Sequence, residues 1–439
     1  MPRIALLARV VYGARNAWAP LASALEAEGL LGEELRIHLV DGAPFEEAER
    51  LRSKGWEPVI LYGVSSIDYL WLRGEIREAA KRYRVIAGGP HAEGAYWHLL
   101  RDGVYAAVVG DGEAAIVELA RHLLGDQDIS RVPNIAYREN GRFRVTRNVL
   151  VDLDSYKPHY PRLALYPPIE IMRGCPYKCR FCQVPWLFKA TVRYRSIEAV
   201  AEAVRDYVAA GKRRIRFIAP VGFAYQSREE GRPNPEAIEE LLLTVRRLGG
   251  EPYLGSFPSE TRPEYVTREV LEVVRKYAAN RRVSVGLQSG SNRLLEAVGR
   301  GHTVEEALEA VDLILEYGLT PVVDIIFGLP GETREDVEAT VKVMFDLAGK
   351  KARLRLHTFL PLPGTPLARA RPKPVHDLYR KAVLKLLGRG VLEGDWEDQE
   401  KLAPKIYCLI ARDPAPTPEP MPLPGAESYC GRVESRPQQ

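Results

Sequence analysis

The run Met172-Arg173-Gly174-Cys175-Pro176-Tyr177-Lys178-Cys179-Arg180-Phe181-Cys182 places three cysteines in one short loop. The whole chain of 439 residues has only five cysteines, so this crowding needs a chemical reason. Thiolates at such spacings repel one another unless a soft metal centre neutralises them, and zinc and iron–sulfur clusters are the centres that suit cysteine ligands. The loop therefore predicts a metal centre.

The number of cysteines separates the candidate centres. A structural zinc site uses four protein ligands; the nearest upstream candidate for the fourth is His159, and no histidine follows the loop until His302. A disulfide among the three would leave one thiol over, although intracellular disulfides do occur in hyperthermophiles. A four-iron cluster held by three cysteines keeps one iron free to bind another molecule, and the spacing favours this alternative.

The loop resembles the signature of the radical S-adenosylmethionine (SAM) enzymes, with Gly174 before the first cysteine and the aromatic Phe181 before the last. The resemblance implies that Cys175, Cys179 and Cys182 ligate three irons of a [4Fe-4S] cluster, and that the fourth iron binds the amino and carboxylate groups of SAM. One electron from the cluster then cleaves SAM to methionine and a 5′-deoxyadenosyl radical, which abstracts hydrogen from a substrate. Such an enzyme takes its electron from a reductant such as flavodoxin or ferredoxin.

Length and composition predict two domains, or one large domain with attachments. A hydrophobic content of 46% provides for a normal core, and a net charge of +4 is too small to indicate nucleic-acid binding. Charges interrupt the apolar stretches well before the ~20 residues of a membrane span. Met1-Pro2-Arg3 runs straight into a strand-like segment without a signal peptide, so we expect a cytoplasmic protein. Charged residues at 27%, four Met and 33 Pro favour a thermophile.

Strand and helix patterns alternate over residues 1–126 in the rhythm of βαβ units. Amphipathic segments such as 20–28 and 67–82 separate the apolar runs. We therefore predict an α/β fold class whose first domain is flavodoxin-like (Rossmann-type), with a five-stranded parallel sheet. The predicted strands are residues 4–8, 35–40, 59–64, 84–87 and 105–109.

Small and polar residues stand at the carboxyl ends of three of these strands, where open parallel sheets bind their ligands. A single glycine there would merely turn a strand into a helix, but three such ends in succession favour a ligand face. The pattern is similar to the cobalamin-binding domain that precedes the catalytic domain in one class of radical SAM enzymes. That resemblance implies cobalamin contacts from Ser65, Ser66, Gly88, Gly89, His91, Gly110, Gly112 and Glu113.

The loop after the first strand departs from that class. Domains that coordinate cobalt from below carry Asp-x-His-x-x-Gly there, whereas this chain has Arg9-Val10-Val11-Tyr12-Gly13-Ala14-Arg15-Asn16, without a histidine. Several radical SAM members of the class also lack this histidine. Two alternatives therefore stay open: cobalamin bound without a protein ligand to cobalt, or a domain that binds no cofactor.

Residues 127–167 are interpreted as a hairpin followed by a linker. Asn140-Gly141 stands between two alternating segments, 134–138 and 142–146, and this dipeptide is typical of a β-hairpin turn. We interpret the hairpin as a structural connection between domains, and residues 152–168 as the linker.

Residues 168–370 repeat the strand and helix alternation, with helical patterns at 196–210 and 235–248. Six such units resemble the partial (β/α)6 barrel of the radical SAM fold, whose cluster loop leaves the first strand. Barrel strands deliver functional groups at their carboxyl ends. The predicted strands are residues 169–172, 214–219, 252–257, 283–287, 321–327 and 354–359.

The chain beyond the barrel divides into a helical extension, residues 371–411, and a proline-rich tail, residues 412–439. A helix is predicted at 375–387, whereas the tail is expected to form no regular secondary structure. We interpret Cys408 as a buried thiol and Cys430 as a tail thiol, with a disulfide between them as the minor alternative.

Polar groups at the ends of the later barrel strands supply candidate SAM contacts. Ser291 and Thr333 also fit helix N-caps, Asp324 in a buried-looking strand is either ligand-facing or paired, and His302 is interpreted as structural. The second strand ends in Ala219-Pro220-Val221-Gly222-Phe223 where the family often has acidic residues, so Glu260 is the candidate to receive the SAM amino group. The resemblance implies SAM contacts from Phe181, Ser259, Glu260, Gln288, Ser289, Ser291, Asp324 and Gly328.

Several functions compete. The leading hypothesis is a radical SAM enzyme in which methylcobalamin donates a methyl group to an unreactive carbon. Methylthiolation of tRNA or protein is disfavoured, because residues 1–174 hold no cysteine for an auxiliary cluster and no basic RNA-binding extension follows the barrel. A non-methylating enzyme with a vestigial cobalamin domain is another alternative. A cobalamin- or cluster-binding sensor is opposed by the motifs around Gln288 and Gly328, and the altered second strand keeps it open.

Overall fold

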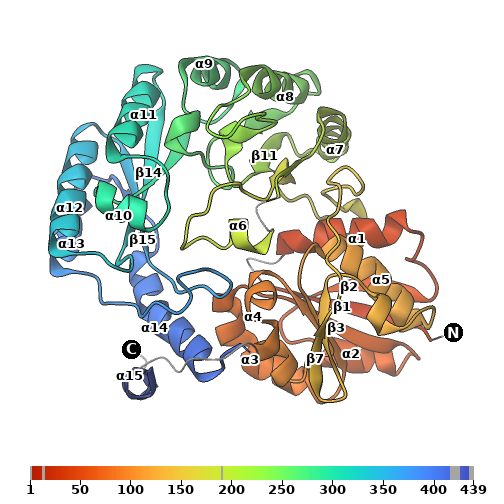
Figure 1. Ribbon diagram of the computed structural model, residues 1–439. Coiled ribbons are helices and arrows are strands. Elements are labelled where there is room, and N and C mark those ends of the chain that lie inside the picture. Colours follow the sequence, from red (N-terminus) through yellow and green to blue (C-terminus); the bar gives the residue numbers. More distant parts are fainter. Residues whose placement is uncertain (1, 12–14, 189–190, 416–425, 435–439) are drawn as a thin grey trace. The chain divides into compact units, whose positions relative to one another are not determined.

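The computed structural model describes residues 2–11, 15–188, 191–415 and 426–434 (Figure 1). The chain divides into two compact units. Unit 1 comprises Met1–Pro167 with Asp413–Pro422, and unit 2 comprises Pro168–Arg412 with Leu423–Gln439. Within the described ranges, no helix combines the length and the apolar character that crossing a membrane requires.

Unit 1 begins with five parallel strands: β1 (Ile4–Val10), β2 (Leu35–Asp41), β3 (Glu57–Gly63), β4 (Arg84–Gly88) and β5 (Ala106–Val108). They pair in the order β2-β1-β3-β4-β5, which confirms the predicted flavodoxin-like sheet. The helices between and after them are α1 (Trp18–Ala27), α2 (Phe45–Arg52), α3 (Ser66–Ala80), α4 (Pro90–Arg101) and α5 (Gly112–Leu124). Alternate residues of β1, such as Ile4 and Leu6, share one core with α1 and α5, because successive strand side chains point to opposite faces.

The predicted hairpin forms as β6 (Ile135–Glu139) and β7 (Arg142–Val145), paired antiparallel around Asn140-Gly141. Both turn residues have positive φ, 48° and 76°, as a two-residue hairpin turn of this kind requires. Strand β6 also pairs antiparallel with β5. The hairpin therefore extends the sheet of unit 1 to seven strands.

Unit 2 contains the six predicted barrel strands in two sheets. The first joins β8 (Ile169–Glu170), β11 (Arg214–Ile218) and β12 (Glu251–Tyr253), and the second joins β13 (Arg282–Gln288), β14 (Thr320–Phe327) and β15 (Arg353–Thr358) to a short further strand, β16 (Leu392–Glu393). The amide of Ser284 donates to the carbonyl oxygen of Gly255 (2.7 Å), and that of Thr261 to the carbonyl oxygen of Ser284 (2.9 Å). These bonds join the two sheets into one open series of parallel strands, and β16 is an addition that the sequence pattern missed.

The larger helices of unit 2 follow one another around the outside of these strands (Figure 1). Their first turns begin at side-chain caps: Ser196, Ser291, Thr303 and Thr333 each accept a backbone N–H, which confirms the predicted caps at Ser291 and Thr333. The helices are α6 (Val184–Leu187), α7 (Ile197–Ala209), α8 (Pro235–Arg247), α9 (Arg268–Tyr277), α10 (Asn292–Ala297), α11 (Val304–Glu316), α12 (Arg334–Gly349), α13 (Asp377–Leu387), α14 (Trp396–Arg412) and α15 (Ala426–Glu434).

The end of the chain differs from its prediction in two ways. Helix α15 forms within the tail that was expected to lack regular structure; the proline-rich run 416–425 lies outside the described residues. Cys408 of α14 and Cys430 of α15 form a disulfide, so their interpretation as two separate thiols is wrong. Tyr407 and Tyr429 pack edge to face beside this bridge, and the small apolar cluster holds the two helices together.

Candidate functional site

The cysteine loop of unit 2 connects two short antiparallel strands, β9 (Met172–Arg173) and β10 (Arg193–Tyr194). Cys175 and Cys179 are buried and Cys182 is half-buried. Burial raises the pKa of the Cys175 thiol to about 11 and that of Cys182 to about 12. A metal ligand must be a thiolate, so positive charge close to the loop favours the form of the cysteines that binds a metal.

Two buried arginines supply positive charge beside Cys179. The Nη1 atoms of Arg262 and Arg300 lie 3.6 Å and 3.4 Å from its Sγ atom. Arg300 also donates to the carbonyl oxygen of Gly286 (2.6 Å), and Arg262 stacks on the ring of Tyr177 at 3.4 Å. Neither arginine was predicted to contact the cysteine loop, because each lies far from it along the chain.

Among the described residues, no three His, Cys, Asp or Glu side chains converge as ligands of one metal ion.

His302, which was interpreted as a structural residue, is buried near the cysteine loop's arginines. Its Nε2 atom lies 3.2 Å from the carbonyl oxygen of Gly286. It lies close to the same backbone oxygen that Arg300 contacts.

A cavity of about 570 Å³ lies at the carboxyl ends of the unit 2 strands. Four of the predicted SAM residues line it, although they come from four different segments. Its other lining residues were not predicted as site residues. The complete lining is Phe181, Phe257, Glu260, Gln288, Asp324, Ile326, Arg355, His357, Gly394 and Asp395.

Arg355 of β15 connects the acidic residues around the cavity. Its Nη1 atom contacts Glu260 (3.0 Å) and Asp324 (3.3 Å), and its Nε atom contacts Glu393 (3.4 Å). Burial, followed by the charge of Asp324, raises the pKa of Glu260. Burial works to lower the pKa of Arg355, but Asp324, Glu260 and Glu393 outweigh it and raise that pKa. Asp324 is therefore paired with Arg355, and it also lines the cavity.

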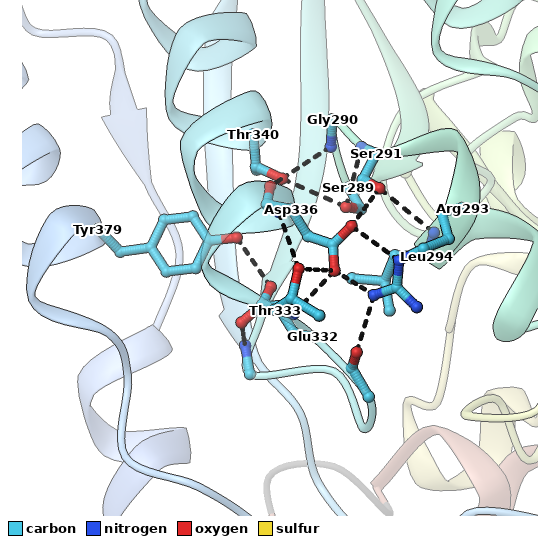
Figure 2. A network of polar contacts seen from close by, with 12 residues as sticks. Ser289, Gly290, Ser291, Arg293, Leu294, Glu332, Thr333, Asp336, Thr340 and Tyr379 are labelled. Atoms are coloured by element: carbon cyan, nitrogen blue, oxygen red, sulfur yellow. Dashed lines mark hydrogen bonds and ion pairs between the residues drawn. The ribbon is translucent and has the colours of Figure 1, made fainter.

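The remaining predicted SAM residues do not line the cavity. Ser259 is fully buried and its hydroxyl donates to the carbonyl oxygen of Ser256 (3.0 Å). Gly328, with φ of 72°, forms a turn in which its amide donates to Glu332 (3.2 Å). Burial raises the pKa of Glu332 to about 7, and Tyr379 also donates to this carboxyl group (Figure 2).

Ser289 and Ser291 belong to a polar network that ties the loop after β13 to helix α12 (Figure 2). The Ser289 hydroxyl lies 3.2 Å from that of Thr340, and the Ser291 hydroxyl donates to Asp336 (2.5 Å). Asp336 also accepts from Thr333 and Arg293, so one carboxylate caps α12 and anchors the loop. These serine side chains therefore fix the loop that follows Gln288, which is one of the residues that line the cavity.

The carboxyl group of Asp336 is expected to make the stability of the folded protein sensitive to acid. Burial works to raise its pKa, but bonds from Arg293, Ser291 and Thr333 outweigh it and lower that pKa from 3.8 to about 2. Because its pKa is lower in the folded state, the carboxylate of Asp336 contributes about 2 kcal/mol to the free energy of unfolding. This contribution is present above pH 4 and is lost as the pH falls towards 2. We expect Asp336→Asn to cost about 2 kcal/mol at pH 7 and little at pH 2, measured by urea unfolding.

The matched control for that experiment is Glu338→Gln on the same helix. Glu338 forms an exposed ion pair with Arg334, and such exposed pairs contribute little to stability. A cost for Asp336→Asn that stays the same from pH 7 to pH 2 would contradict the assigned pKa.

In unit 1, the predicted cobalamin residues lie at the carboxyl edge of the sheet, and several are occupied by internal contacts. Ser65 caps α3 in a capping box with Asp68. The amide of His91 donates to the carbonyl oxygen of Val64 (3.1 Å). A Cβ at Gly89 would lie 2.8 Å from that same oxygen, so glycine permits the close approach of these two strand ends.

Ser66 and His91 belong to a buried chain of hydrogen bonds in unit 1. The imidazole of His91 lies between the Ser66 hydroxyl (3.0 Å) and His98 (3.3 Å), and His98 Nε2 donates to the carbonyl oxygen of Asp413 (2.8 Å). Burial lowers the pKa of both histidines, that of His98 to about 3. His91 is therefore neutral and fully occupied in the core.

The other predicted cobalamin residues follow β4 and β5. Gly88 ends β4, and Gly110, with φ of 139°, lies against Asn134 and Asn148. Gly112 begins α5 against Leu21, and Glu113 is buried in its first turn. Of the loop after β1, residues 12–14 lie outside the described residues.

The comparisons with known proteins agree with this geometry. Residues 169–344 match the radical SAM superfamily. An uncharacterized methyltransferase of Pyrococcus horikoshii is 25% identical over 77% of this chain and 75% of its own. A putative methylthiotransferase of Methanocaldococcus jannaschii is 30% identical over 56% of this chain, which spans about half of that relative (53%).

Two solved structures share the fold. One is the radical SAM methyltransferase TsrM from Kitasatospora setae with cobalamin and a [4Fe-4S] cluster bound, with a TM-score of 0.67 and 19% identity over 85% of this chain and 76% of TsrM. The other is the cobalamin-dependent radical SAM enzyme OxsB, with a TM-score of 0.59 and 18% identity over 78% of this chain and 52% of OxsB. The chain therefore contains a domain, residues 169–344, that matches the radical SAM superfamily, and it shares its fold with these two enzymes. Membership of this superfamily implies a [4Fe-4S] cluster and SAM as cofactors.

Proposed function

We propose that this radical SAM enzyme binds its cluster through Cys175, Cys179 and Cys182, and that it transfers a methyl group from cobalamin to carbon. The observation that carries the proposal is the cavity at the strand ends, because Phe181 of the cysteine loop and Asp324 line the same space. The second support is unit 1, whose strand order is that of a flavodoxin-like ligand-binding sheet.

The residues of the cysteine loop suit an iron–sulfur cluster in two respects: the type of ligand atom they offer and the charge around them. Three thiolates that each take a different iron need not meet at one point, as the ligands of a single ion must. Arg262 and Arg300 stabilise the thiolate of Cys179 and offset the negative charge that three thiolates bring. When bound, the cluster supplies the electron that cleaves SAM, and cobalamin supplies the methyl group.

The cavity residues fit a cationic ligand such as SAM. Asp324 and Glu260 present carboxylates toward a ligand that carries an ammonium and a sulfonium group. Phe181 and Ile326 provide apolar surface beside them, and Gln288 provides an amide. The role of these residues is to bind and orient SAM next to the cysteine loop.

The edge of unit 1 is the proposed cobalamin site. Ser66 and His91 are occupied in the core, so the contacts proposed here come from the backbone around Gly88, Gly89, Gly110 and Gly112. In this arrangement the predicted residues Ser65 and Glu113 hold the starts of α3 and α5, and cobalt has no protein ligand from the loop after β1.

A second candidate function is methylthiolation, because this chain matches about half of a relative that is named a putative methylthiotransferase. An auxiliary cluster would need further cysteines, and Cys408 and Cys430 are joined to each other. The two functions differ in cofactor, so one experiment separates them.

The test is anaerobic reconstitution with iron and sulfide, followed by cobalamin and SAM assays under a reductant. We expect one [4Fe-4S] cluster per chain, one bound cobalamin, and 5′-deoxyadenosine with methionine after reduction. Failure to cleave SAM would overturn the radical SAM mechanism. Cleavage without cobalamin uptake would overturn only the methyl transfer, and a second cluster would favour methylthiolation.

A further inference from the structure

His357 of β15 lies at the cavity with both ring nitrogens engaged. Its Nε2 atom is 3.3 Å from Oδ1 of Asp324 on β14, and its Nδ1 atom is 3.3 Å from the side-chain nitrogen of Gln399 on α14. Gln399 and His357 both lie beyond residues 169–344, the part that matches the superfamily. In this corner of the cavity, His357 and Asp324 belong to barrel strands and Gln399 belongs to the helical extension.

The orientation of Gln399 determines where the proton of His357 lies. The backbone amide of Thr358 donates to Gln399 Oε1 at 2.7 Å, so the amide oxygen is fixed there and the amide nitrogen faces His357. An amide nitrogen only donates, so Nδ1 of His357 must accept and carries no proton. The ring proton is on Nε2, and His357 donates it to Asp324.

Asp324 consequently has a hydrogen bond and an ion pair on the same oxygen. Arg355 and His357 both contact Oδ1, and the described contacts include none to Oδ2. Since Asp324 lines the cavity, Oδ2 is the oxygen that can accept a hydrogen bond from a ligand. The other charged groups around the cavity are Glu260, Asp395 and Arg355.

We propose that Gln399 is a positioning residue that keeps His357 a neutral donor to Asp324, so that Asp324 presents one anionic oxygen to a cationic group of the ligand. This inference rests on the proposed function in one respect, because that ligand is SAM. A neutral donor orients the carboxylate without cancelling its charge, whereas an imidazolium would cancel much of the attraction for a cation.

The proton assignment is tested first, by nitrogen-15 NMR of the histidine side chains in the full chain. His357 is assigned by comparison with His357→Asn among the eight histidines. At neutral pH we expect an unprotonated Nδ1 and a protonated Nε2. In Gln399→Glu, a carboxylate oxygen replaces the amide nitrogen while the other oxygen still accepts from Thr358, so Nδ1 gains a proton and the ring becomes an imidazolium.

The control is Glu397→Gln, which changes an exposed charge two residues away on α14 and should leave the His357 signals unchanged. A protonated Nδ1 in the wild-type protein, or an unchanged tautomer in Gln399→Glu, would overturn the positioning role.

The consequence for the ligand is tested by binding of labelled SAM to the reconstituted holoenzyme. We expect about three- to tenfold weaker binding for Gln399→Glu and less than a twofold change for Glu397→Gln. Unchanged SAM affinity in a variant with the imidazolium signature would overturn the role of Asp324 as the ligand anchor. Wild-type protein that binds no SAM would overturn the proposed function instead, and the NMR result would still decide the role of Gln399.

Discussion

Cys179→Ala is expected to abolish the [4Fe-4S] cluster and all reductive cleavage of SAM. Cys179 is the central cysteine of the loop and the one whose sulfur both buried arginines contact. Its loss removes one iron ligand and leaves two guanidinium groups facing each other without the thiolate between them. Repulsion between two buried cations then acts against closure of the loop around any remaining iron.

The measurement is iron and sulfide content with the visible absorption of the reconstituted protein. The control is the double variant Cys408→Ser with Cys430→Ser, which has the same number of loop cysteines as the wild type and lacks only the disulfide. We expect the control to reconstitute fully. A full cluster in Cys179→Ala, or loss of the cluster in the control, would contradict the ligand assignment.

Local signals explain why much of the fold could be predicted. The five strands of unit 1 and the six of unit 2 are short apolar runs between amphipathic helices, and that alternation depends on neighbours in sequence. The caps at Ser291 and Thr333 are local for the same reason, since each hydroxyl accepts from an amide three residues on.

The cavity could be predicted only in part, because its partners meet over long sequence separations. Glu260, Gln288 and Asp324 lie on or after separate strands, and the sequence pattern predicted them as polar groups near strand ends. Arg355 and His357 were missed, although they alternate with the buried Leu354 and Leu356 along β15. That alternation, with charged residues on the inward face of a barrel strand, is the signal that could have found them.

Some candidate ligand residues have structural partners that the sequence does not reveal. Ser289, Ser291 and His91 are polar residues at strand ends, yet their hydrogen bonds go to Thr340, Asp336 and Ser66. The disulfide between Cys408 and Cys430 was only the minor alternative, because nothing in the local sequence brings the two thiols together. In each case the deciding contact is made by tertiary packing.

Gly174→Ala is expected to displace the cysteine loop although it removes no ligand. A Cβ at position 174 would lie 1.9 Å from the carbonyl oxygen of Thr191 and 2.8 Å from its carbonyl carbon, and both are backbone atoms. The φ angle of 85° adds a further cost of about 1–2 kcal/mol for an L-residue. Because the clash is with backbone, the chain must move, and Cys175 moves with it.

We expect this variant to lose about 3–5 kcal/mol of the free energy of unfolding and most of its cluster, measured by urea unfolding and iron content. Gly211→Ala is the matched control, since Gly211 has a similar φ of 75° but nothing within 4 Å of the added Cβ. The control should lose about 1 kcal/mol and bind a full cluster. If both variants behave alike, the backbone at Thr191 yields to the added methyl group, and glycine at position 174 serves only the backbone angle.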